Sequence, residues 1–326
     1  MSIDMDHQEI TIDAVRRARD RIARTARWTP LERSRWLSDE HRRNVFLKLE
    51  CFQLTGSFKL RGAMAKLSAL TPKEGARGVL TVSAGNHGLA VAHCCEALGL
   101  SATIVVPESA SRAKVEAIRR YPVALVERGA NYDDAERAAR EMERQTGATF
   151  VSPYNDPDVI AGQGTIGLEI LEDAPGLDAI IVPVGGGGLL AGVAIAAKAV
   201  NPRIQIYGAE PMTSPTMSAA LQAGRIVEIE EQDTLADGCA GNIEPGSITF
   251  PIIRKLVDGI ILVSEEAIRN AIANTARSEH IMIEGSAAVS IAALEDSRLA
   301  GTSAGAIVSG RNISLEVFDK VISSKH

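Results

Sequence analysis

Short runs of β-branched and other apolar residues alternate along the chain with longer segments in which apolar residues recur every three or four positions. The short runs predict strands at 44–49, 78–82, 101–106, 123–127, 149–151, 179–184, 204–209, 260–263 and 304–308. The periodic segments predict helices at 9–24, 57–69, 87–98, 111–120, 132–146, 162–173, 188–199, 265–278 and 285–296. Because strands and helices alternate, we expect an α/β fold of parallel sheets built from right-handed βαβ units.

So many strands favour two sheets rather than one. The polar, turn-rich segment SPYNDPD at 152–158 is a candidate crossing between two lobes, and LTPKEGARG at 70–78 is a less clear one. We therefore expect a small α/β domain at residues 80–152, inserted into a large domain formed by residues 1–79 and 153–326.

The composition is that of an ordinary globular protein. The 326 residues are 45% hydrophobic and 23% charged, so the chain is neither disordered nor fibrous. The 35 basic and 41 acidic residues give a net charge of -6, which argues against a nucleic-acid or anionic-membrane partner. Residues 179–197 form a long uncharged run, but Pro183 and the glycines after it interrupt the run, so we expect no membrane span.

The cysteines and the N-terminal sequence indicate the compartment. Cys51, Cys94, Cys95 and Cys239 form no CxxC pair, so we expect neither a disulfide framework nor a zinc site. The first 25 residues are polar and then basic, without the apolar centre of a secretory signal. We therefore expect a cytoplasmic protein.

A lysine in the segment ECFQLTGSFKLRGA, residues 50–63, is the first candidate for chemistry. Lys59 stands between Phe58 and Leu60, where a core-facing ammonium group is costly to bury. Desolvation lowers the pKa of a lysine and makes it a nucleophile that can form a Schiff base with an aldehyde. The spacing alone favours the simpler arrangement, in which the Lys59 side chain points to solvent.

Three further segments lie at the ends of predicted strands, where ligands collect in α/β sheets. In SAGNHGLA, residues 83–90, small residues allow backbone N–H groups to approach an anion, and Asn86 and His87 add side-chain donors. In VPVGGGGLLAG, residues 182–192, four glycines between a strand and an apolar helix favour a phosphate site. In VSGRN, residues 308–312, Ser309 or Asn312 is a candidate ligand contact. Each segment could instead be an ordinary turn.

The glycine-rich segment also matches a different class of enzyme. Gly186, Gly188 and Ala191 fit the pattern G-x-G-x-x-A, and Glu210 follows at the end of the next predicted strand. This arrangement is typical of a dinucleotide site, in which the acid binds a ribose. An NAD-dependent oxidoreductase is therefore an alternative, although it leaves the Lys59 and Asn86 segments without a role.

Taken together and in this order, GSFKLRGA, SAGNHG, GGGGLLAG and VSGRN resemble the fold-type II pyridoxal-phosphate enzymes. The similarity is to the branch of threonine/serine dehydratases (threonine deaminases) and serine racemases. It extends to TPLERS at 29–34, VIAGQGT at 159–165, LADG at 235–238 and PIIRKLVD at 251–258. The resemblance implies a two-lobed, tryptophan synthase β-like fold with mostly parallel sheets flanked by helices, pyridoxal 5'-phosphate as cofactor, and a homodimer.

The resemblance also implies roles for individual residues. Lys59 would hold the cofactor as a Schiff base and then remove the α-proton of the substrate. The residues implied to bind the cofactor are Phe58 on the ring, Asn86 at the ring oxygen, Ser309 at the pyridine nitrogen, and Gly185, Gly186, Gly187, Gly188 and Leu189 at the phosphate. The residues implied to bind the amino-acid substrate are Ser83, Ala84, Gly85, Asn86, His87 and Tyr154.

The implied reaction is β-elimination from a β-hydroxy L-amino acid, by default L-threonine or L-serine, to give a 2-oxo acid and ammonia. Serine racemases carry a serine at the position of Ala84, where it protonates the face opposite the lysine, so we expect poor racemisation. Thr216 stands where metal-assisted relatives carry a carboxylate that joins Glu210, so we expect no bound metal and little dependence on Mg²⁺ or Ca²⁺.

Several alternatives stay open within this resemblance. Arg311 replaces a small residue of the relatives and could pair with a carboxylate between the lobes or meet a polar substrate. The substrate could therefore be a hydroxyectoine-pathway intermediate, a phenylserine or a hydroxyaspartate. A serine racemase, a β-replacement enzyme and a pyridoxal-phosphate carrier are further alternatives. The chain ends at His326 without the regulatory extension of biosynthetic threonine deaminases, which favours a role in amino-acid catabolism.

Overall fold

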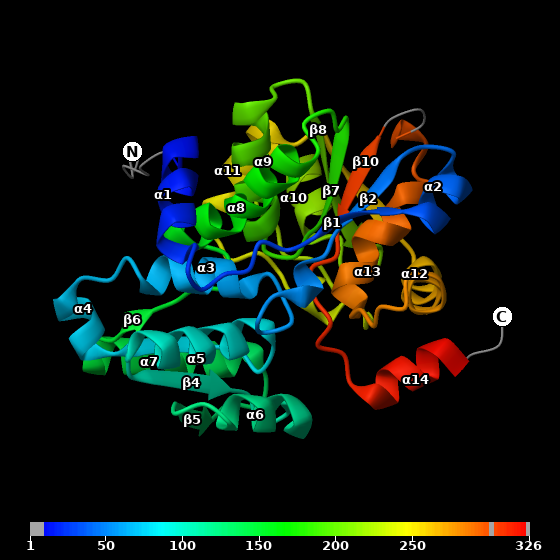
Figure 1. The fold of residues 1–326 in the computed structure, drawn as a ribbon. Coiled ribbons are helices and arrows are strands. Elements are labelled where there is room, and N and C mark those ends of the chain that lie inside the picture. The colour runs from blue at the N-terminus through cyan, green and yellow to red at the C-terminus, as the bar shows by residue number, and fades with distance from the viewer. Residues whose placement is uncertain (1–9, 300–302, 324–326) are drawn as a thin grey trace.

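A computed structural model, which describes residues 10–299 and 303–323, shows two separate sheets with helices packed against them (Figure 1). Within these residues, the larger sheet contains, in spatial order, β1 (Leu31–Ser34), β2 (Val45–Lys48), β10 (Ala304–Ile307), β7 (Ala179–Pro183), β8 (Gln205–Pro211) and β9 (Gly259–Val263). The smaller sheet contains β5 (Ala124–Glu127), β4 (Ala102–Val106), β3 (Val79–Val82) and β6 (Thr149–Phe150). Strand β1 is antiparallel to β2, and the other neighbouring strands are parallel. The expected α/β fold with mostly parallel sheets is confirmed.

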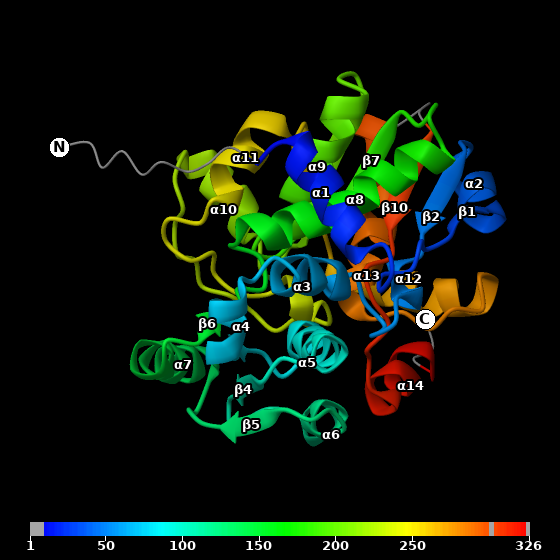
Figure 2. The same cartoon turned by 60° about the vertical axis from the view of Figure 1, so that its left-hand side comes forward.

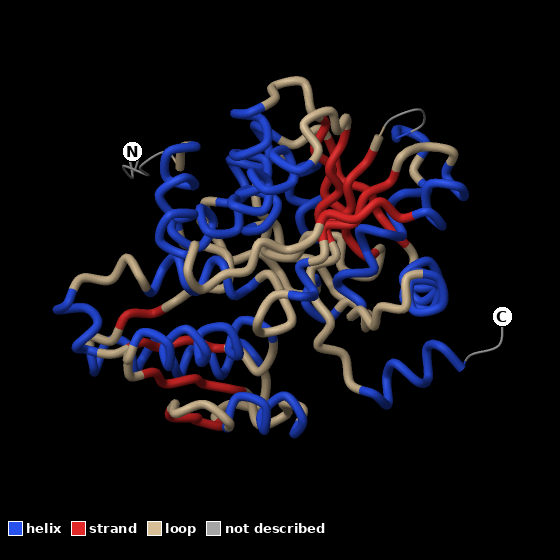
Figure 3. Tube along the Cα trace, viewed as in Figure 1, coloured by secondary structure: helices blue, strands red, loops and turns tan. Residues whose placement is uncertain are grey.

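Helices cover both sheets, whose strands form two distinct groups in Figure 3. One face of the larger sheet carries α1 (Ile12–Ile22), α8 (Pro157–Asp173), α9 (Gly188–Val200), α10 (Thr216–Ala223) and α11 (Thr249–Leu256), and the other carries α2 (Arg35–His41), α12 (Glu265–Ser278) and α13 (Gly285–Ala292). The smaller sheet is flanked by α5 (Asn86–Leu98), α6 (Arg112–Arg119) and α7 (Tyr132–Thr146), with α4 (Pro72–Arg77) beside β6. Helix α3 (Lys59–Leu67) lies between the two sheets, and α14 (Leu315–Ser323) contacts α12 (Figure 2).

Apolar side chains on both faces of the larger sheet explain this layering. Along β7, Ile180 and Val182 belong to the core that contains α8 and α9, whereas Ala179 and Ile181 belong to the core that contains α13. Successive side chains of a strand point to opposite faces, so a strand buried on both faces is apolar throughout. Within the described residues, no helix combines the length and apolar character needed to cross a membrane.

The strand order places three segments that are distant in sequence at one edge of the larger sheet. Strand β10 comes from the end of the chain but lies between β2 and β7. Beyond its carboxyl end, β2 leads to α3 and Lys59, β7 leads to Gly185–Gly188, and β10 leads to Ser309. A reversal of strand order leaves a crevice at these ends, which is where ligands bind in open α/β sheets.

The strands follow the sequence prediction with small shifts at their ends. The helix predicted at 162–173 begins earlier, at Pro157, because the Asp156 side chain accepts hydrogen bonds from the N–H groups of Asp158 and Val159. The sequence pattern does not predict β1, α2, α4, α10, α11 and α14, which are short. Residue 9, predicted to open the first helix, lies outside the described residues. The division into domains at 80–152 and the remainder stays a prediction.

Helix α3 packs closely on α8 because glycines stand where the helices meet. A Cβ added at Gly162 of α8 would lie 2.7 Å from the carbonyl oxygen of Arg61 and 2.7 Å from the Cβ of Ala65. A Cβ added at Gly62 of α3 would lie 2.8 Å from Val159 Cγ1. Non-bonded carbon atoms normally stay about 3.5–4.0 Å apart. The two glycines therefore set how near α3 lies to α8.

We expect Gly162→Ala to lower the free energy of unfolding by about 1–3 kcal/mol, because the new methyl group overpacks the contact with α3. This expected loss of stability is opposite in sign to the effect of helix propensity, which by itself favours alanine over glycine by roughly 0.5–1 kcal/mol. Urea unfolding of the purified protein measures the change. Gly176→Ala is the matched control, since nothing lies within 4 Å of a Cβ added there. Equal stability of the two variants would contradict the packing argument.

Candidate active site

A cavity of about 1210 Å³ lies beyond the carboxyl ends of strands from both sheets. All of the residues predicted to bind cofactor or substrate line this one cavity: Phe58, Lys59, Ser83, Ala84, Gly85, Asn86, His87, Tyr154, Gly185, Gly186, Gly187, Gly188, Leu189 and Ser309. The fold thus brings the predicted residues together, and their individual roles stay predictions.

Lys59 begins α3, and its side chain extends into the cavity rather than into bulk solvent. Its Nζ donates a hydrogen bond of 2.9 Å to the carbonyl oxygen of Pro153 and lies 5.1 Å from the centre of the Phe58 ring. Burial lowers the pKa of Lys59 to about 8, although the Glu284 carboxylate acts in the opposite direction. A substantial neutral fraction near pH 8 suits Lys59 to act as a nucleophile or a base.

The glycine loop, residues Gly185–Gly188, connects β7 to α9 and borders the cavity. Gly187 has a φ of +86°, which residues with a side chain rarely adopt. A Cβ at Gly185 would lie 2.9 Å from the Gly238 carbonyl oxygen, and a Cβ at Gly187 would lie 2.6 Å from Ile253 Cδ1. The first N–H groups of α9 have no partner within the helix, so this N-terminus attracts an anion.

Tyr154 packs directly on the glycine loop. A Cβ added at Gly186 would lie 2.4 Å from the Tyr154 ring, and one at Gly188 would lie 2.9 Å from the Tyr154 Cα. The Tyr154 hydroxyl accepts a hydrogen bond of 3.0 Å from the Glu244 N–H group, which holds the ring in place. Side chains at either glycine would therefore displace this wall of the cavity.

The segment Ser83–His87 follows β3 and turns into α5 at the cavity. Ser83 Oγ accepts a hydrogen bond of 3.1 Å from the Gly85 N–H group, which closes the turn. A Cβ at Gly88 would lie 2.1 Å from the Ser83 carbonyl oxygen, so only glycine permits this approach. The turn presents the N-terminus of α5 to the cavity, as expected for binding a carboxylate.

His87 is buried and electrically neutral near pH 7. Burial, reinforced by the charge of Lys59, lowers its pKa to about 3. Its Nε2 lies 3.0 Å from the Val151 carbonyl oxygen, a distance that assigns the ring proton to Nε2. Nδ1 then keeps a lone pair, and no hydrogen-bond partner for it is found among the described residues.

Glu284 and Asn312 join Asn86 in a network at the cavity wall. Asn86 Nδ2 donates to Glu284 Oε1 over 2.8 Å, and Asn86 Oδ1 accepts from Asn312 Nδ2 over 2.6 Å. The Asn312 N–H group donates to Glu284 Oε2 over 3.0 Å. Burial raises the pKa of Glu284 to about 7, and Asp237 adds to this effect. No spacing or motif signalled Glu284, because only the fold brings it to Asn86.

Arg311 and Glu210 lie away from the cavity. Arg311 is exposed, with its guanidinium 5.7 Å from the centre of the Phe52 ring, and it does not line the cavity. The structure thus gives no support to a contact between Arg311 and a polar substrate, and the role of Arg311 stays open.

Glu210 is buried, and its carboxylate accepts hydrogen bonds of 2.7 and 2.9 Å from the N–H groups of Met217 and Ser218 at the start of α10. Glu210 is fully buried and does not line the cavity, so it cannot reach a ribose bound there, and the geometry contradicts the dinucleotide interpretation. The described residues contain no group of three or more His, Cys, Asp and Glu side chains arranged to hold a metal ion.

The donor set fits a phosphorylated aromatic aldehyde. Lys59 offers an amine of lowered pKa for the aldehyde, and Phe58 lies beside it. The glycine loop offers an uncrowded helix N-terminus for the phosphate. The remaining turn, Ser83–His87, offers a second anion-binding edge for an amino acid.

Comparisons with known proteins agree with this chemistry. A family model described as "Pyridoxal-phosphate dependent enzyme" matches residues 22–310. The L-threonine ammonia-lyase of Thermotoga maritima is 40% identical over 96% of this chain and 78% of that protein. The catabolic L-threonine dehydratase of Escherichia coli K12 is 41% identical over 94% of each chain. Maize serine racemase superposes with a TM-score of 0.90 at 36% identity, covering 95% of this chain and 96% of that one.

We expect the Lys59 amine to react fastest above pH 8, because burial lowers its pKa to about 8. Reductive methylation with labelled formaldehyde, followed by mass spectrometry, gives the modification rate of each lysine as pH is varied. The protein is first freed of bound aldehyde, and circular dichroism checks its fold. The Lys59 rate should be half-maximal near pH 8, with exposed Lys73 as internal reference. A midpoint near the ordinary lysine value of about 10.4 would contradict the burial argument.

Proposed function

Because the chain belongs to the family of pyridoxal-phosphate-dependent enzymes, we propose that it is an ammonia-lyase that converts L-threonine or L-serine into a 2-oxo acid and ammonia. Its class is that of a pyridoxal-phosphate-dependent carbon–oxygen lyase. The observation that carries the proposal is the Lys59 amine, whose pKa burial lowers to about 8, in the same cavity as the glycine loop. The named activities of the threonine enzymes from Thermotoga maritima and Escherichia coli support the choice of substrate.

Each part of the cavity has a task in this proposal. When bound, pyridoxal phosphate supplies an electron sink that eases removal of the substrate α-proton. Neutral Lys59 accepts that proton at Nζ. The residues that hold the cofactor are Phe58 at its ring, Asn86 at its ring oxygen, Ser309 at its pyridine nitrogen, and Gly185–Gly188 with Leu189 at its phosphate. The turn Ser83–His87 holds the substrate carboxylate, and Tyr154 forms part of the wall.

We place the protein in the cytoplasm as a homodimer. All four cysteines are free and buried, which fits a reducing compartment. Leu315 and Val317 on α14 expose large apolar side chains, which fits contact with a second copy.

Lys59→Ala should abolish turnover of L-threonine and L-serine, because it removes both the attachment point of the cofactor and the base. The assay follows 2-oxo acid and ammonia in protein loaded with pyridoxal phosphate, together with the absorption spectrum of the bound cofactor. Lys73→Ala, which removes an exposed lysine, is the control and should keep wild-type activity. Full activity in Lys59→Ala would overturn the proposal. A cofactor-loaded wild type that is inert toward both substrates but converts a phenylserine or a hydroxyaspartate would overturn the assignment of substrate.

A specific residue separates this proposal from a serine racemase. Ala84 lines the cavity in the turn that precedes α5. Its methyl group cannot donate a proton, whereas a racemase needs an acid on the face opposite Lys59. An alanine at this position therefore supports elimination rather than racemisation as the main reaction.

The wild type should racemise L-serine at least about 100-fold more slowly than it eliminates from it, since a positioned acid or base is worth roughly 10²–10⁴-fold. Ala84→Ser should raise racemisation relative to elimination, because it adds a hydroxyl group at this turn. Ala84→Gly is the matched control, which changes size without adding an acid and should leave the ratio low. Chiral chromatography of serine beside a keto-acid assay measures both rates. Wild-type racemisation as fast as elimination would contradict the role given to Ala84.

A further inference from the structure

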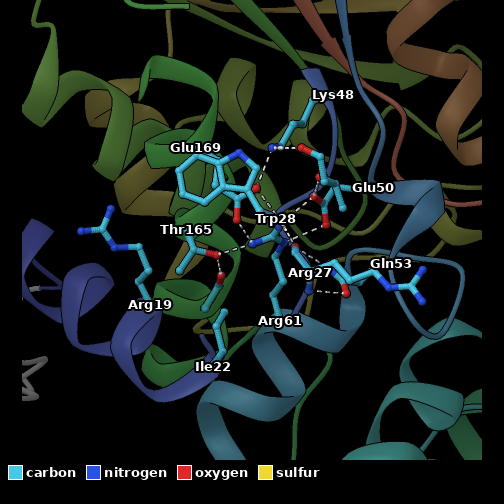
Figure 4. A network of polar contacts seen from close by, with 12 residues as sticks. Arg19, Ile22, Arg27, Trp28, Lys48, Glu50, Gln53, Arg61, Thr165 and Glu169 are labelled. Atoms are coloured by element: carbon cyan, nitrogen blue, oxygen red, sulfur yellow. Dashed lines mark hydrogen bonds and ion pairs between the residues drawn. The ribbon is translucent and has the colours of Figure 1, made fainter. Parts of the chain in front are cut away.

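A buried ion cluster lies directly behind the helix that carries Lys59 (Figure 4). We use this name for Lys48, Glu50, Arg61 and Glu169, whose side chains are at most 5% exposed. Lys48 Nζ lies 2.6 Å from Glu169 Oε2. Arg61 contacts both carboxylates, with Nη2 2.8 Å from Glu50 Oε1 and Nη1 2.5 Å from Glu169 Oε1. The two positive and two negative charges balance.

Arg61 uses its whole guanidinium group in this cluster. Nε and Nη2 each donate to Glu50 over 2.8 Å, and Nη1 and Nη2 donate to Glu169 over 2.5 and 2.8 Å. Further hydrogen bonds reach Thr165 Oγ1 at 3.2 Å and the Arg27 carbonyl oxygen at 3.0 Å. A planar fork that grips two carboxylates fixes orientation as well as distance.

Burying such a cluster brings little net stability, because desolvation of the charges offsets their attraction. An apolar cluster of similar volume would hold these segments together at least as well. The cluster therefore serves mainly to fix the orientation of the segments that it joins. The partners of Arg61 come from the segment before β1, from the 3₁₀ turn Glu50–Phe52 after β2, and from α8. Arg61 consequently orients α3 against all of them.

Lys59 and Arg61 stand two positions apart in the first turn of α3. Residues two apart on an α-helix differ in direction by about 200°, so their side chains leave opposite sides of the helix. Lys59 extends into the cavity while Arg61 extends into the cluster. Any rotation of α3 that loosens the grip of Arg61 therefore moves Lys59 within the cavity.

We propose that Arg61 is a positioning residue for Lys59, holding the first turn of α3 so that Lys59 Nζ stays at its place in the cavity. The inference rests on the proposed role of Lys59 as attachment point and base. It assigns alignment of the base to the contacts that Arg61 makes within the buried ion cluster, and leaves the Lys48–Glu169 pair a role in stability alone. A base displaced by about 1 Å can lose roughly 100-fold in rate, so alignment of this kind has a measurable effect.

The test compares Arg61→Lys with Lys48→Met. Arg61→Lys keeps the charge but loses the fork, and Lys48→Met removes a cation that faces the same Glu169 from β2, away from α3. We measure kcat and KM for L-threonine in the cofactor-loaded protein, and the pH midpoint of Lys59 methylation in aldehyde-free protein whose fold circular dichroism has checked. Thermal unfolding of each variant reports stability.

Arg61→Lys should lower kcat at least about tenfold with KM changed less than about twofold, and should raise the Lys59 midpoint by roughly one pH unit as the amine gains water. Lys48→Met should lower the unfolding temperature and leave the Lys59 midpoint unchanged. Thr165→Val, which removes a single partner of Arg61, is the milder second variant and should shift the midpoint in the same direction by less.

An unchanged Lys59 midpoint in both Arg61→Lys and Thr165→Val, whatever their stability, would overturn the positioning role. Equal shifts in Arg61→Lys and Lys48→Met would also overturn it, because the effect would then belong to general loosening of the cluster. The methylation midpoint needs neither cofactor nor turnover. An enzyme that fails to convert L-threonine therefore contradicts the proposed function without affecting this comparison.

Discussion

The parallel direction of β2, β10 and β7 is the constraint on which the rest of this structure depends. Because these strands share one direction, their carboxyl ends meet at one edge, and three segments separated by more than a hundred residues meet there too. The same edge receives the N-termini of the helices that follow, with their unpaired N–H groups. An anion site beside a reactive amine is thus a consequence of topology, and the particular residues refine it.

Burial has different effects on the charged groups of the cavity and on those of the buried ion cluster. In the buried ion cluster every charged side chain has a partner of opposite sign at hydrogen-bond distance, so these contacts offset the loss of hydration. In the cavity the groups are desolvated with few counter-charges, so the pKa of Lys59 falls to about 8 and that of Glu284 rises to about 7. Groups that titrate near neutrality are those able to exchange protons at physiological pH, which is what an elimination reaction requires.

The sequence could predict those features that local chemistry determines. Strands such as 179–184 are apolar throughout, and the glycine loop and Lys59 stand in segments whose composition is unfavourable without a ligand. The pairing of Asn86 with Glu284 joins residues 198 positions apart, and no local pattern contains that information. The sequence does not predict the buried ion cluster for the same reason, since Lys48, Glu50 and Arg61 are typical surface residues and only the fold buries them. Short elements such as β1 are not predicted, because four residues show too little periodicity to distinguish a strand from a turn.

The match of Gly186, Gly188 and Ala191 to a dinucleotide pattern shows what a glycine motif does and does not determine. Glycines after a strand provide close approach to a phosphate, and any phosphorylated cofactor can use that approach. A dinucleotide site also needs an acid that binds the ribose, and here Glu210 is buried against the start of α10 and does not line the cavity. The Lys59 amine in the same cavity favours an aldehyde-bearing cofactor instead, because a dinucleotide needs no amine at that place. The glycine loop therefore provides a phosphate site, and the side chains that face the rest of the bound group determine which phosphorylated cofactor binds.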